Sequence, residues 1–589
     1  MTYLTPGEPK KRLRTTVAIV VGLAIVFGVR LIDLQVIEAE AINAKSFANR
    51  AVTRVLPALR GEIIDAQGKV LAKSVYRYDV NAAPSKVLPI TREVNGQTVS
   101  VSVEQLASEI GAIIGMTPQE VMQKITGTGE YSQIKKRVDA EQYRKVRALE
   151  IPWLYFDPIP TRIYPNGAVA GNVLGFLGSD GTPLEGLELQ YNKCLAGLDG
   201  KETFEKGEDG IKIPSSVVTT QRAVPGKNIQ LTIDSDLQYF AQQALTSQLA
   251  FLKADWGSAL VIEAKTGKIL VAAEVPTVDP NNPGKTASQN RGSRIFRAAF
   301  EPGSTLKTVT AATVIDTGAG NPLTQTVAPY SWKIPNSGGY VVTDSHVHGY
   351  DKLTLTGVLR DSSNTGIMRI GQSVPYTVRY QYLQKFGLGS KTGVGYPGEQ
   401  SGLLNPVDKW DGIKKYVSMF GQGISVTPLQ SAFLYQTIAN KGVRLQPQLV
   451  DGCIDANGGE VKNVVKPGVR AISEKTASET ASMLEMNVIE GGVGRTGGVP
   501  GYRVGGKSGT AQITDPNTGR YGPLHAISFI GMAPVEDPQF VVAVTFFKSR
   551  TVSNALGATP VFKKLFQQVL RDRRVPPSTT KPTMIATTW

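Results

Sequence analysis

The sequence predicts an α+β protein with a single N-terminal transmembrane helix, a mixed domain of strands and helices, and a C-terminal domain in which a five-stranded antiparallel sheet is flanked by helices. Three observations predict this architecture. Residues 15–29 form an uncharged run after a basic N-terminus. Apolar strand segments within residues 257–274 and 504–547 are separated by stretches with helical patterns, as in layered α+β domains. The 589 residues are enough for two or more domains, each with its own core.

The N-terminal segment is predicted to anchor the chain in a membrane. Residues 1–14 form a basic cytoplasmic segment, and residues 15–36 form the anchor. The strictly uncharged run is shorter than the ~20 residues of a spanning helix, but Arg30 can extend its charged end to the interface and let the helix continue. Basic residues before the helix place the N-terminus in the cytoplasm and the rest of the chain outside the cell membrane.

A cleaved signal peptide is the alternative interpretation of this segment. Ala39-Glu40-Ala41 imitates a cleavage site. That tripeptide lies too far from the apolar run, beyond the charged residues Arg30, Asp33 and Glu38. An uncleaved single-pass helix is therefore favoured.

Composition and charge narrow the classes of partner. Hydrophobic residues make up 41% and charged residues 19% of the chain, as in ordinary globular proteins. The net charge of +15 suits anionic surroundings such as membrane headgroups, cell-wall polymers or nucleic acid, although a basic solvated surface explains it equally well. Because no long Lys/Arg run has interleaved aromatic residues, we expect no nucleic-acid partner.

Cysteine and histidine are scarce, which argues against disulfide scaffolds, metal sites and histidine-based catalysis. Cys194 and Cys453 lie far apart in the sequence, so they exclude a disulfide scaffold and a cysteine-based zinc site. His346 and His348 could form a ligand pair, but no acidic motif of metalloenzyme spacing accompanies them. We therefore expect no metal and no cofactor. With His525 as the third and last histidine, a Ser-His-Asp triad is disfavoured and a lysine base is favoured.

Residues 37–225 are predicted to form a scaffold or partner-binding domain without chemistry of its own. Extended segments are expected within residues 55–72, around a turn at 65–68, and helices within 103–125 and 140–149. A glycine-rich passage follows at 167–210. Ser132 and Lys135 have the spacing of a nucleophile and its base, but they stand in a charged stretch that we interpret as a solvated helix face.

Residues 226–575 are predicted to form the second domain. Asp234 can cap a helix over residues 235–252, and a further helix is expected from Ser304 to near residue 318. A last helix begins at Thr559-Pro560 and runs through residue 569. The five strands of the sheet are expected at 257–263, 268–274, 504–514, 526–532 and 540–547. The tail at 576–589, rich in Thr and Pro, is expected to be disordered.

The candidate nucleophile lies in residues 300–307, FEPGSTLK. Pro302-Gly303 forms a turn, and Ser304 starts an apolar helix. Lys307, three residues later, has its amine on the same helix face as the hydroxyl. A lysine in a dry pocket can lose its proton well below its usual pKa and then activate a serine.

Two later motifs complete the candidate site. Ser362 and Asn364 form a Ser-x-Asn cluster between helical stretches, and Lys507-Ser508-Gly509-Thr510 lies on a strand whose glycines let a ligand approach the backbone. The ordered set Ser-x-x-Lys, Ser-x-Asn and Lys-Ser-Gly-Thr resembles the penicilloyl-serine transferase superfamily. Order and context reject three imitations of these motifs, at residues 265–267, 288–290 and 391–393.

Further segments resemble the class B penicillin-binding proteins, the monofunctional peptidoglycan D,D-transpeptidases. Residues 60–72 are similar to the start of that family's pedestal, and Arg162-x-Tyr164-Pro165 and Gly186-Leu187-Glu188 match later pedestal motifs. Residues 421–430, GQGISVTPLQ, are close to another family segment. The resemblance implies an elongated, β-rich pedestal (a dimerisation-like domain) and a transpeptidase domain. The division-specific FtsI type is the most similar, and the elongation-specific type is the alternative.

The resemblance also implies the roles of the site residues. Ser304 is the nucleophile, Lys307 its base, and Ser362 the donor of a proton to the leaving D-Ala. Asn364 and Lys507 complete the catalytic set: Lys507 would help the proton transfer and supply positive potential, and Asn364 would bind the donor's amide. The donor substrate, a stem peptide ending in D-Ala-D-Ala, would be bound by Ser508, Gly509 and Thr510, with backbone N–H groups of Ser304 and Thr510 as the oxyanion hole. β-Lactams would mimic the donor. An FtsW-type glycosyltransferase and other divisome proteins are the implied partners.

Enzymes that use the same Ser/Lys site offer other functions. A D,D-carboxypeptidase or a serine β-lactamase would transfer the acyl group to water. Neither typically needs a large pedestal and an anchor. A β-lactam sensor without catalysis is a third class, but the candidate site residues are all present, and only about fourteen residues precede the anchor to form an output domain.

Overall fold

The computed structural model describes residues 9–94, 96–205, 216–454, 459–489, 491–515 and 518–589. The chain forms two compact units. The first comprises Met1–Ala58 and Gly197–Pro225, and the second comprises Leu59–Ala196 and Gly226–Trp589.

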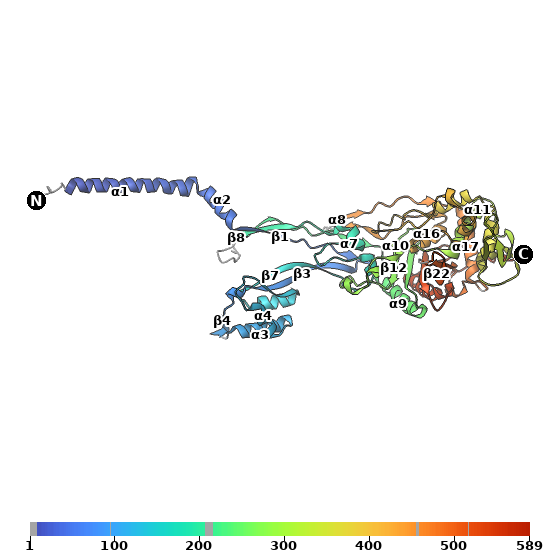
Figure 1. Cartoon of the computed structure of the whole chain (residues 1–589), viewed down its shortest axis with the longest axis horizontal. Coiled ribbons are helices and arrows are strands. Elements are labelled where there is room, and N and C mark those ends of the chain that lie inside the picture. Colours follow the sequence, from blue (N-terminus) through green and yellow to red (C-terminus); the bar gives the residue numbers. More distant parts are fainter. Residues whose placement is uncertain (1–8, 95, 206–215, 455–458, 490, 516–517) are drawn as a thin grey trace. The chain divides into compact units, whose positions relative to one another are not determined.

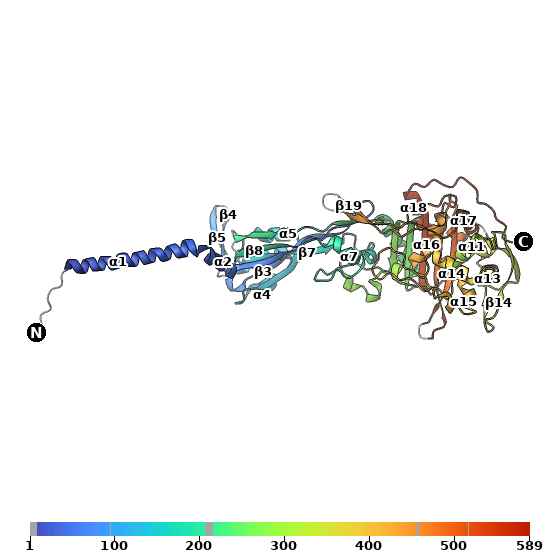
Figure 2. The same ribbon diagram turned by 90° about the horizontal axis from the view of Figure 1, so that it is seen from above.

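The first unit begins with helical segments. Helix α1 (Pro9–Ile32) continues through a π-helical turn (Asp33–Ile37), and α2 (Ala39–Arg50) follows (Figure 2). In the part of the chain that the structure describes, Pro9–Ile37 is the one helix long and apolar enough to cross a membrane, and the predicted anchor lies inside it. Strands β1 (Ala51–Leu56), β8 (Gly200–Glu205) and β9 (Val218–Gln221) then form an antiparallel sheet in that order.

The second unit contains a seven-stranded sheet among its described residues. Six strands lie in the order β19-β18-β10-β2-β3-β6, and β7 pairs with β3. Their bounds are β2 (Ile63–Ile64), β3 (Val70–Ala82), β6 (Ser132–Val138), β7 (Leu154–Ile163), β10 (Asn228–Leu231), β18 (Val450–Ile454) and β19 (Glu460–Lys462). Because β2 pairs in parallel with β10, this sheet continues across residue 225, where the sequence suggested a domain boundary.

Helices cover one end of this sheet (Figure 1). Helices α3 (Val103–Ile114), α4 (Pro118–Ile125) and α5 (Ala140–Arg147) share a core with β3, β6 and β7. The Ser132/Lys135 pair lies on strand β6, and Lys135 Nζ donates to the carbonyl of Ile114. The prediction of a solvated helix face for this pair is therefore wrong, because its amine caps the end of a neighbouring helix.

A buried carboxylate joins the segments that resemble pedestal motifs. Glu188, on α7 (Gly186–Gln190), accepts from Arg60 Nε at 2.5 Å, from Arg162 Nε at 2.7 Å and from the Tyr164 hydroxyl at 3.2 Å. Glu188 is completely buried, and the two arginines compensate the cost of burying its charge.

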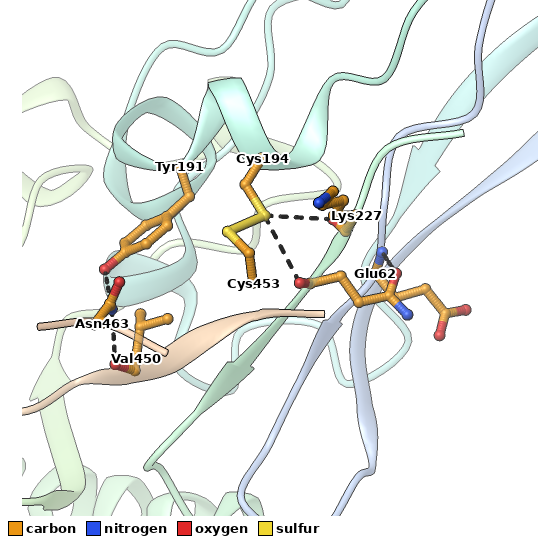
Figure 3. Close-up of a disulfide and its surroundings, with 8 residues drawn as sticks. Glu62, Tyr191, Cys194, Lys227, Val450, Cys453 and Asn463 are labelled. Atoms are coloured by element: carbon orange, nitrogen blue, oxygen red, sulfur yellow. Dashed lines mark hydrogen bonds between the residues drawn. A yellow bond between two sulfur atoms is a disulfide. The ribbon is translucent and has the colours of Figure 1, made fainter. Parts of the chain in front are cut away.

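The two cysteines are bonded to each other. Cys194 on α8 (Asn192–Leu195) and Cys453 on β18 form a disulfide, with their Cα atoms 6.3 Å apart (Figure 3). Beside it, Asn463 Nδ2 donates to the Tyr191 hydroxyl and to the carbonyl of Val450, both at 2.9 Å. Two cysteines so far apart in the sequence do not form a disulfide scaffold, and their positions in the sequence do not predict that they form this single bond.

The predicted five-stranded antiparallel sheet is confirmed in the described residues, with the order β12-β11-β23-β22-β21. Its strands are β11 (Trp256–Glu263), β12 (Ile269–Val275), β21 (Gly505–Thr514), β22 (Tyr521–Ala533) and β23 (Phe540–Ser549).

Helices cover both faces of this sheet. Ala259 and Val261 of β11 face a core shared with α9 (Ser235–Leu252) and α18 (Thr559–Asp572). Leu260 and Ile262 face a second core shared with α11 (Lys307–Asp316), α16 (Pro428–Ala439) and α17 (Glu474–Val488). This alternation follows the two-residue period of a strand. Helix α11, which begins at Lys307, is buried against the second face of the sheet.

The segment 576–589 is ordered, so the prediction of a disordered tail is wrong. Ser578 N donates to the carbonyl of Gly501 at 2.9 Å, and Thr588 forms an antiparallel bridge with Leu353. Thr and Pro suit an extended backbone, and here several of its polar groups pair with neighbouring loops and strands.

Candidate active site

The nucleophile segment lies against the edge strand of the five-stranded sheet. Residues Gly303–Leu306 form a 3-10 turn that leads into α11. Gly303 has φ +54°, and a Cβ there would lie 2.9 Å from the carbonyl oxygen of Thr510. At Gly509, a Cβ would lie 2.7 Å from Thr305 Cγ2. Glycine at both positions therefore allows the turn and β21 to approach closely.

The 3-10 turn brings the candidate nucleophile and base together. Side chains three residues apart eclipse in a 3-10 turn, and Lys307 Nζ lies 3.1 Å from Ser304 Oγ. The Lys307 side chain is fully buried, whereas Ser304 is partly exposed. A buried amine next to an accessible hydroxyl is the arrangement that nucleophile activation needs.

Ser362 lies between the two buried amines of the site. It ends α12 (Leu355–Asp361) in a left-handed conformation, with φ 62°, and α13 (Asn364–Gly371) begins two residues later. Its hydroxyl accepts from Lys507 Nζ at 2.8 Å and from Lys307 Nζ at 3.3 Å, and its carbonyl accepts from Lys307. The Ser-x-x-Lys and Lys-Ser-Gly-Thr motifs thus meet at Ser362.

Burial controls the protonation of the two lysines. Desolvation lowers the pKa of Lys307 to about 7, against an opposing effect of Asp344. Desolvation also lowers the pKa of Lys507 well below its usual value; the charge of Lys307 lowers it further, and Asp361 raises it. At neutral pH the two amines are therefore not both in the ammonium form, and a neutral amine is available to act as a base.

The third motif extends along β21. Lys507 Nζ also contacts the carbonyl and the hydroxyl oxygen of Ser508, both at 3.2 Å. Ser508 is partly exposed, Gly509 is buried and Thr510 is exposed. Along β21, exposure therefore increases from the buried Lys507 amine to the side chains of Ser508 and Thr510, which a ligand can reach.

The imitations of the motifs have other partners. Lys265 Nζ pairs with Asp537 at 2.8 Å in a surface turn. Thr392 N donates to Glu399 at 2.7 Å in a loop. Ser288–Asn290 forms a 3-10 helix before the nucleophile segment.

Asp344 organises the Ser-x-Asn motif, and sequence reasoning missed it. Its carboxylate accepts from Ser363 Oγ at 2.6 Å, from Asn364 N at 2.5 Å and from Thr365 N at 3.0 Å. Its Oδ2 also lies 3.1 Å from His348 Nε2. An aspartate eighteen residues before the motif carries no sequence signal for this role.

Glu301, three residues before Ser304, contacts two other segments of the domain. Its carboxylate accepts from Gly423 N at 2.8 Å and from the Tyr521 hydroxyl at 2.9 Å. Burial raises the pKa of Glu301, and these two donors lower it in part. The segment 421–430, singled out by its resemblance, is therefore tied to the nucleophile turn.

Two family models match the chain. The model of the penicillin-binding protein transpeptidase domain matches residues 257–567, and that of the penicillin-binding protein dimerisation domain matches residues 55–231. The transpeptidase match includes all three motifs of the candidate site.

Curated relatives match along nearly the whole chain. Penicillin-binding protein PbpB of Mycolicibacterium smegmatis is 34% identical over 591 residues, covering 96% of this chain and 91% of the relative. The peptidoglycan D,D-transpeptidase FtsI of Escherichia coli is 29% identical over 565 residues, covering 95% of this chain and 91% of that protein.

Solved structures have the same fold. A peptidoglycan synthetase from Bifidobacterium adolescentis matches with a TM-score of 0.72 and 30% identity, covering 92% of this chain and all of the other. Penicillin-binding protein 3 of Mycobacterium tuberculosis complexed with ampicillin matches with a TM-score of 0.71 and 29% identity, covering 91% of this chain and all of the other. The resemblance inferred from the motifs is therefore confirmed: the chain belongs to the class B penicillin-binding proteins, and within them it is FtsI-like.

Proposed function

We propose that this protein is a serine-type peptidoglycan D,D-transpeptidase that cross-links stem peptides during septal cell-wall synthesis. The observation that carries the proposal is the 3.1 Å contact between the fully buried Lys307 amine and the accessible Ser304 hydroxyl. Related proteins named peptidoglycan D,D-transpeptidase support the reaction, and the FtsI-type names support the septal role.

In the first half-reaction, Ser304 Oγ attacks the carbonyl carbon of the penultimate D-Ala in the donor peptide. Neutral Lys307 takes the hydroxyl proton as the new C–O bond forms. The tetrahedral intermediate then loses the terminal D-Ala, whose nitrogen receives a proton through Ser362, which contacts both amines. An acyl ester on Ser304 remains.

We expect the donor's terminal carboxylate to determine which of the two lysines, Lys307 or Lys507, is protonated. In the free protein, two buried amines compete for protons. A carboxylate bound at the hydroxyls of Ser508 and Thr510 would favour the ammonium form of Lys507 beside it. Lys307 is then left neutral, which is the form that the attack requires.

Other residues orient the donor. Asn364 binds the amide of the donor peptide, and its side chain already donates to the carbonyl of Thr343 at 2.9 Å, which fixes its direction. Backbone N–H groups of Ser304 and Thr510 form the oxyanion hole, where losing one donor typically costs ~10²–10³ in rate. Gly509 keeps β21 close enough to Ser304 for this geometry.

In the second half-reaction, an amine from a neighbouring stem peptide attacks the ester carbonyl. A new amide bond forms, the ester C–O bond breaks, and Ser304 regains its proton. A β-lactam enters the first half-reaction as a donor mimic and leaves an ester that water hydrolyses slowly. The ampicillin complex of the similar penicillin-binding protein 3 supports this part of the proposal.

The location follows from two features outside the site. Basic residues in the first turns of α1 precede its apolar run, which favours a cytoplasmic N-terminus and an extracytoplasmic catalytic domain. The Cys194–Cys453 disulfide fits an oxidising compartment. In that position, the membrane anchor and the pedestal would contact an FtsW-type glycosyltransferase and other divisome proteins.

Two readings of the same site remain as alternatives. An elongation-type transpeptidase would share every residue of the mechanism and differ in its partners. A D,D-carboxypeptidase or serine β-lactamase would pass the acyl group to water, so its penicillin adduct would be short-lived.

Labelling with a fluorescent penicillin tests the proposal. We expect the full-length protein to form a long-lived adduct and Ser304→Ala to form none. Ser132→Ala is the matched control, because Ser132 has the same spacing to a lysine but lies on β6. Equal labelling of Ser304→Ala would contradict the site assignment, and rapid release of the label would favour the hydrolases.

A further inference from the structure

We propose that the C-terminal strap, residues 585–589, positions the Asp361–Ser362 end of α12 for acylation. The strap is the end of the tail that follows α18 and runs along the edge of the domain to the C-terminus (Figure 2). This inference rests on the proposed function, because Ser362 is assigned there to proton transfer. Thr587 is the residue through which the strap acts, and it is a positioning residue that touches no substrate.

Backbone hydrogen bonds attach the strap to the start of α12. Strand β16 (Tyr350–Thr354) leads directly into this helix. Thr354 N donates to the carbonyl of Thr587 at 3.0 Å, and Thr354 Oγ1 donates to the carbonyl of Ala586 at 2.7 Å. Thr588 bridges Leu353 in antiparallel fashion. The strap thus adds to β16 as a further extended segment and holds the N-cap residue of α12.

The helix is shaped to receive the strap. Gly357 lies in the first turn of α12, and a Cβ there would lie only 1.9 Å from the carbonyl oxygen of Thr587. Ile585 packs against the core cluster that contains Leu355 and Leu359. The close approach at Gly357 and the packing of Ile585 bind the strap along the helix rather than at one point.

Polar contacts then run from the strap to the catalytic end of the helix. Thr587 Oγ1 accepts from Arg360 Nη1 at 2.7 Å. The same guanidinium makes a bidentate pair with Asp361, at 2.7 Å through Nε and 2.9 Å through Nη2. Asp361 directly precedes Ser362, and its charge acts on Lys507. Thr587 therefore fixes the guanidinium that holds Asp361 beside the two catalytic motifs.

The same tail has a second anchor, at Arg503. Thr580 Oγ1 accepts from Arg503 Nη1 at 2.8 Å, and Ser578 Oγ accepts from Arg503 N at 3.0 Å. Arg503 pairs with Glu485 on α17. A threonine that accepts from an arginine in the same tail is thus available as a matched control.

The test measures acylation of the full-length protein by a chromogenic penicillin. The dependence of the rate on penicillin concentration gives two separate quantities, the binding constant of the non-covalent complex and the limiting acylation rate. We expect Thr587→Val to lower the limiting rate about tenfold, the low end of the effect of one hydrogen bond to a charged group, with the binding constant unchanged. Thr587→Ser, which keeps the hydroxyl, should restore the rate. Thr580→Val should acylate like the wild type.

Three results would overturn the inference. The first is an unchanged limiting rate in Thr587→Val. The second is an equal loss of rate in Thr580→Val, which would indicate general destabilisation. The third is a Thr587→Ser variant as slow as Thr587→Val. A wild-type protein that forms no penicillin adduct would instead overturn the proposed function, so the two failures are distinguishable.

Discussion

The buried carboxylate of Asp344 accepts a hydrogen bond from the hydroxyl of Ser363 at 2.6 Å. Ser363 is the middle residue of the Ser-x-Asn motif and caps α13 by accepting from Gly366 N at 2.9 Å. Asp344 also accepts from the backbone N–H groups of the next two residues. One carboxylate therefore fixes the backbone between Ser362 and the first turn of α13.

Replacing this carboxylate by an amide should loosen the motif. In Asp344→Asn, one acceptor oxygen becomes an NH₂ group that faces donors, and an unsatisfied buried group costs about 1–3 kcal/mol. We expect a lower free energy of unfolding by this amount in urea titrations and an acylation rate reduced about tenfold, because Ser362 and Asn364 lose their fixed direction.

Asp351→Asn is the control for this variant. Asp351 also contacts His348, at 3.0 Å, but its side chain is half exposed. It should change stability by less than about 0.5 kcal/mol, as is usual for surface positions. Wild-type acylation by Asp344→Asn would show that the carboxylate does not position the motif.

Acylation should depend on pH through Lys307. Burial lowers its pKa to about 7, and only the neutral amine can accept the Ser304 proton. Below that pH the amine is protonated, so the acylation rate should fall by about tenfold per pH unit, and above it the rate should level off. Stopped-flow acylation between about pH 5 and 9 measures this limb.

The same profile checks the influence of Asp344. Its negative charge raises the pKa of Lys307, so Asp344→Asn should move the acid limb toward lower pH. A flat profile in the wild type would exclude a lysine that titrates near neutrality as the base.

Local features of this chain could be predicted from its sequence. Asp234 caps α9, and the helix spans Ser235–Leu252 as its cap and apolar pattern indicate. The five strands of the sheet were predicted because each is an apolar run between turn residues. Ser304 and Lys307 were found because three residues bring their side chains together in either an α- or a 3-10 helix.

Contacts between distant segments could not be predicted in the same way. Asp344 reaches Ser363 only because a loop folds back onto α13. The composition of the tail suggested disorder, and only the structure shows that Thr354 and Arg360 satisfy its polar groups. Pairing of this kind depends on tertiary structure, which periodicity and spacing do not encode.

Gly509 should be intolerant of a side chain. A Cβ there would lie 2.7 Å from Thr305 Cγ2 and 3.2 Å from the carbonyl oxygen of Pro302, so β21 would have to move away from the nucleophile turn. Since a displacement of about 1 Å can cost ~10² in rate, we expect Gly509→Ala to lose most of its acylation rate in penicillin-labelling time courses. Gly284→Ala is the control, because nothing lies within 4 Å of that Cβ. Full labelling of Gly509→Ala would refute the role of this close contact.

The Cys194–Cys453 disulfide should stabilise the second unit. It closes a loop of 259 residues and ties α8 to β18, whose neighbour β10 pairs with β2 (Figure 3). A disulfide restricts the unfolded chain and typically contributes about 2–4 kcal/mol. We expect dithiothreitol to lower the melting temperature of the wild type in thermal scans, whereas the double variant Cys194→Ser/Cys453→Ser should melt at the lower temperature with or without reductant. Identical melting of the oxidised and reduced wild type would show that the cross-link adds nothing to the contacts around Tyr191 and Asn463, which would then hold these segments alone.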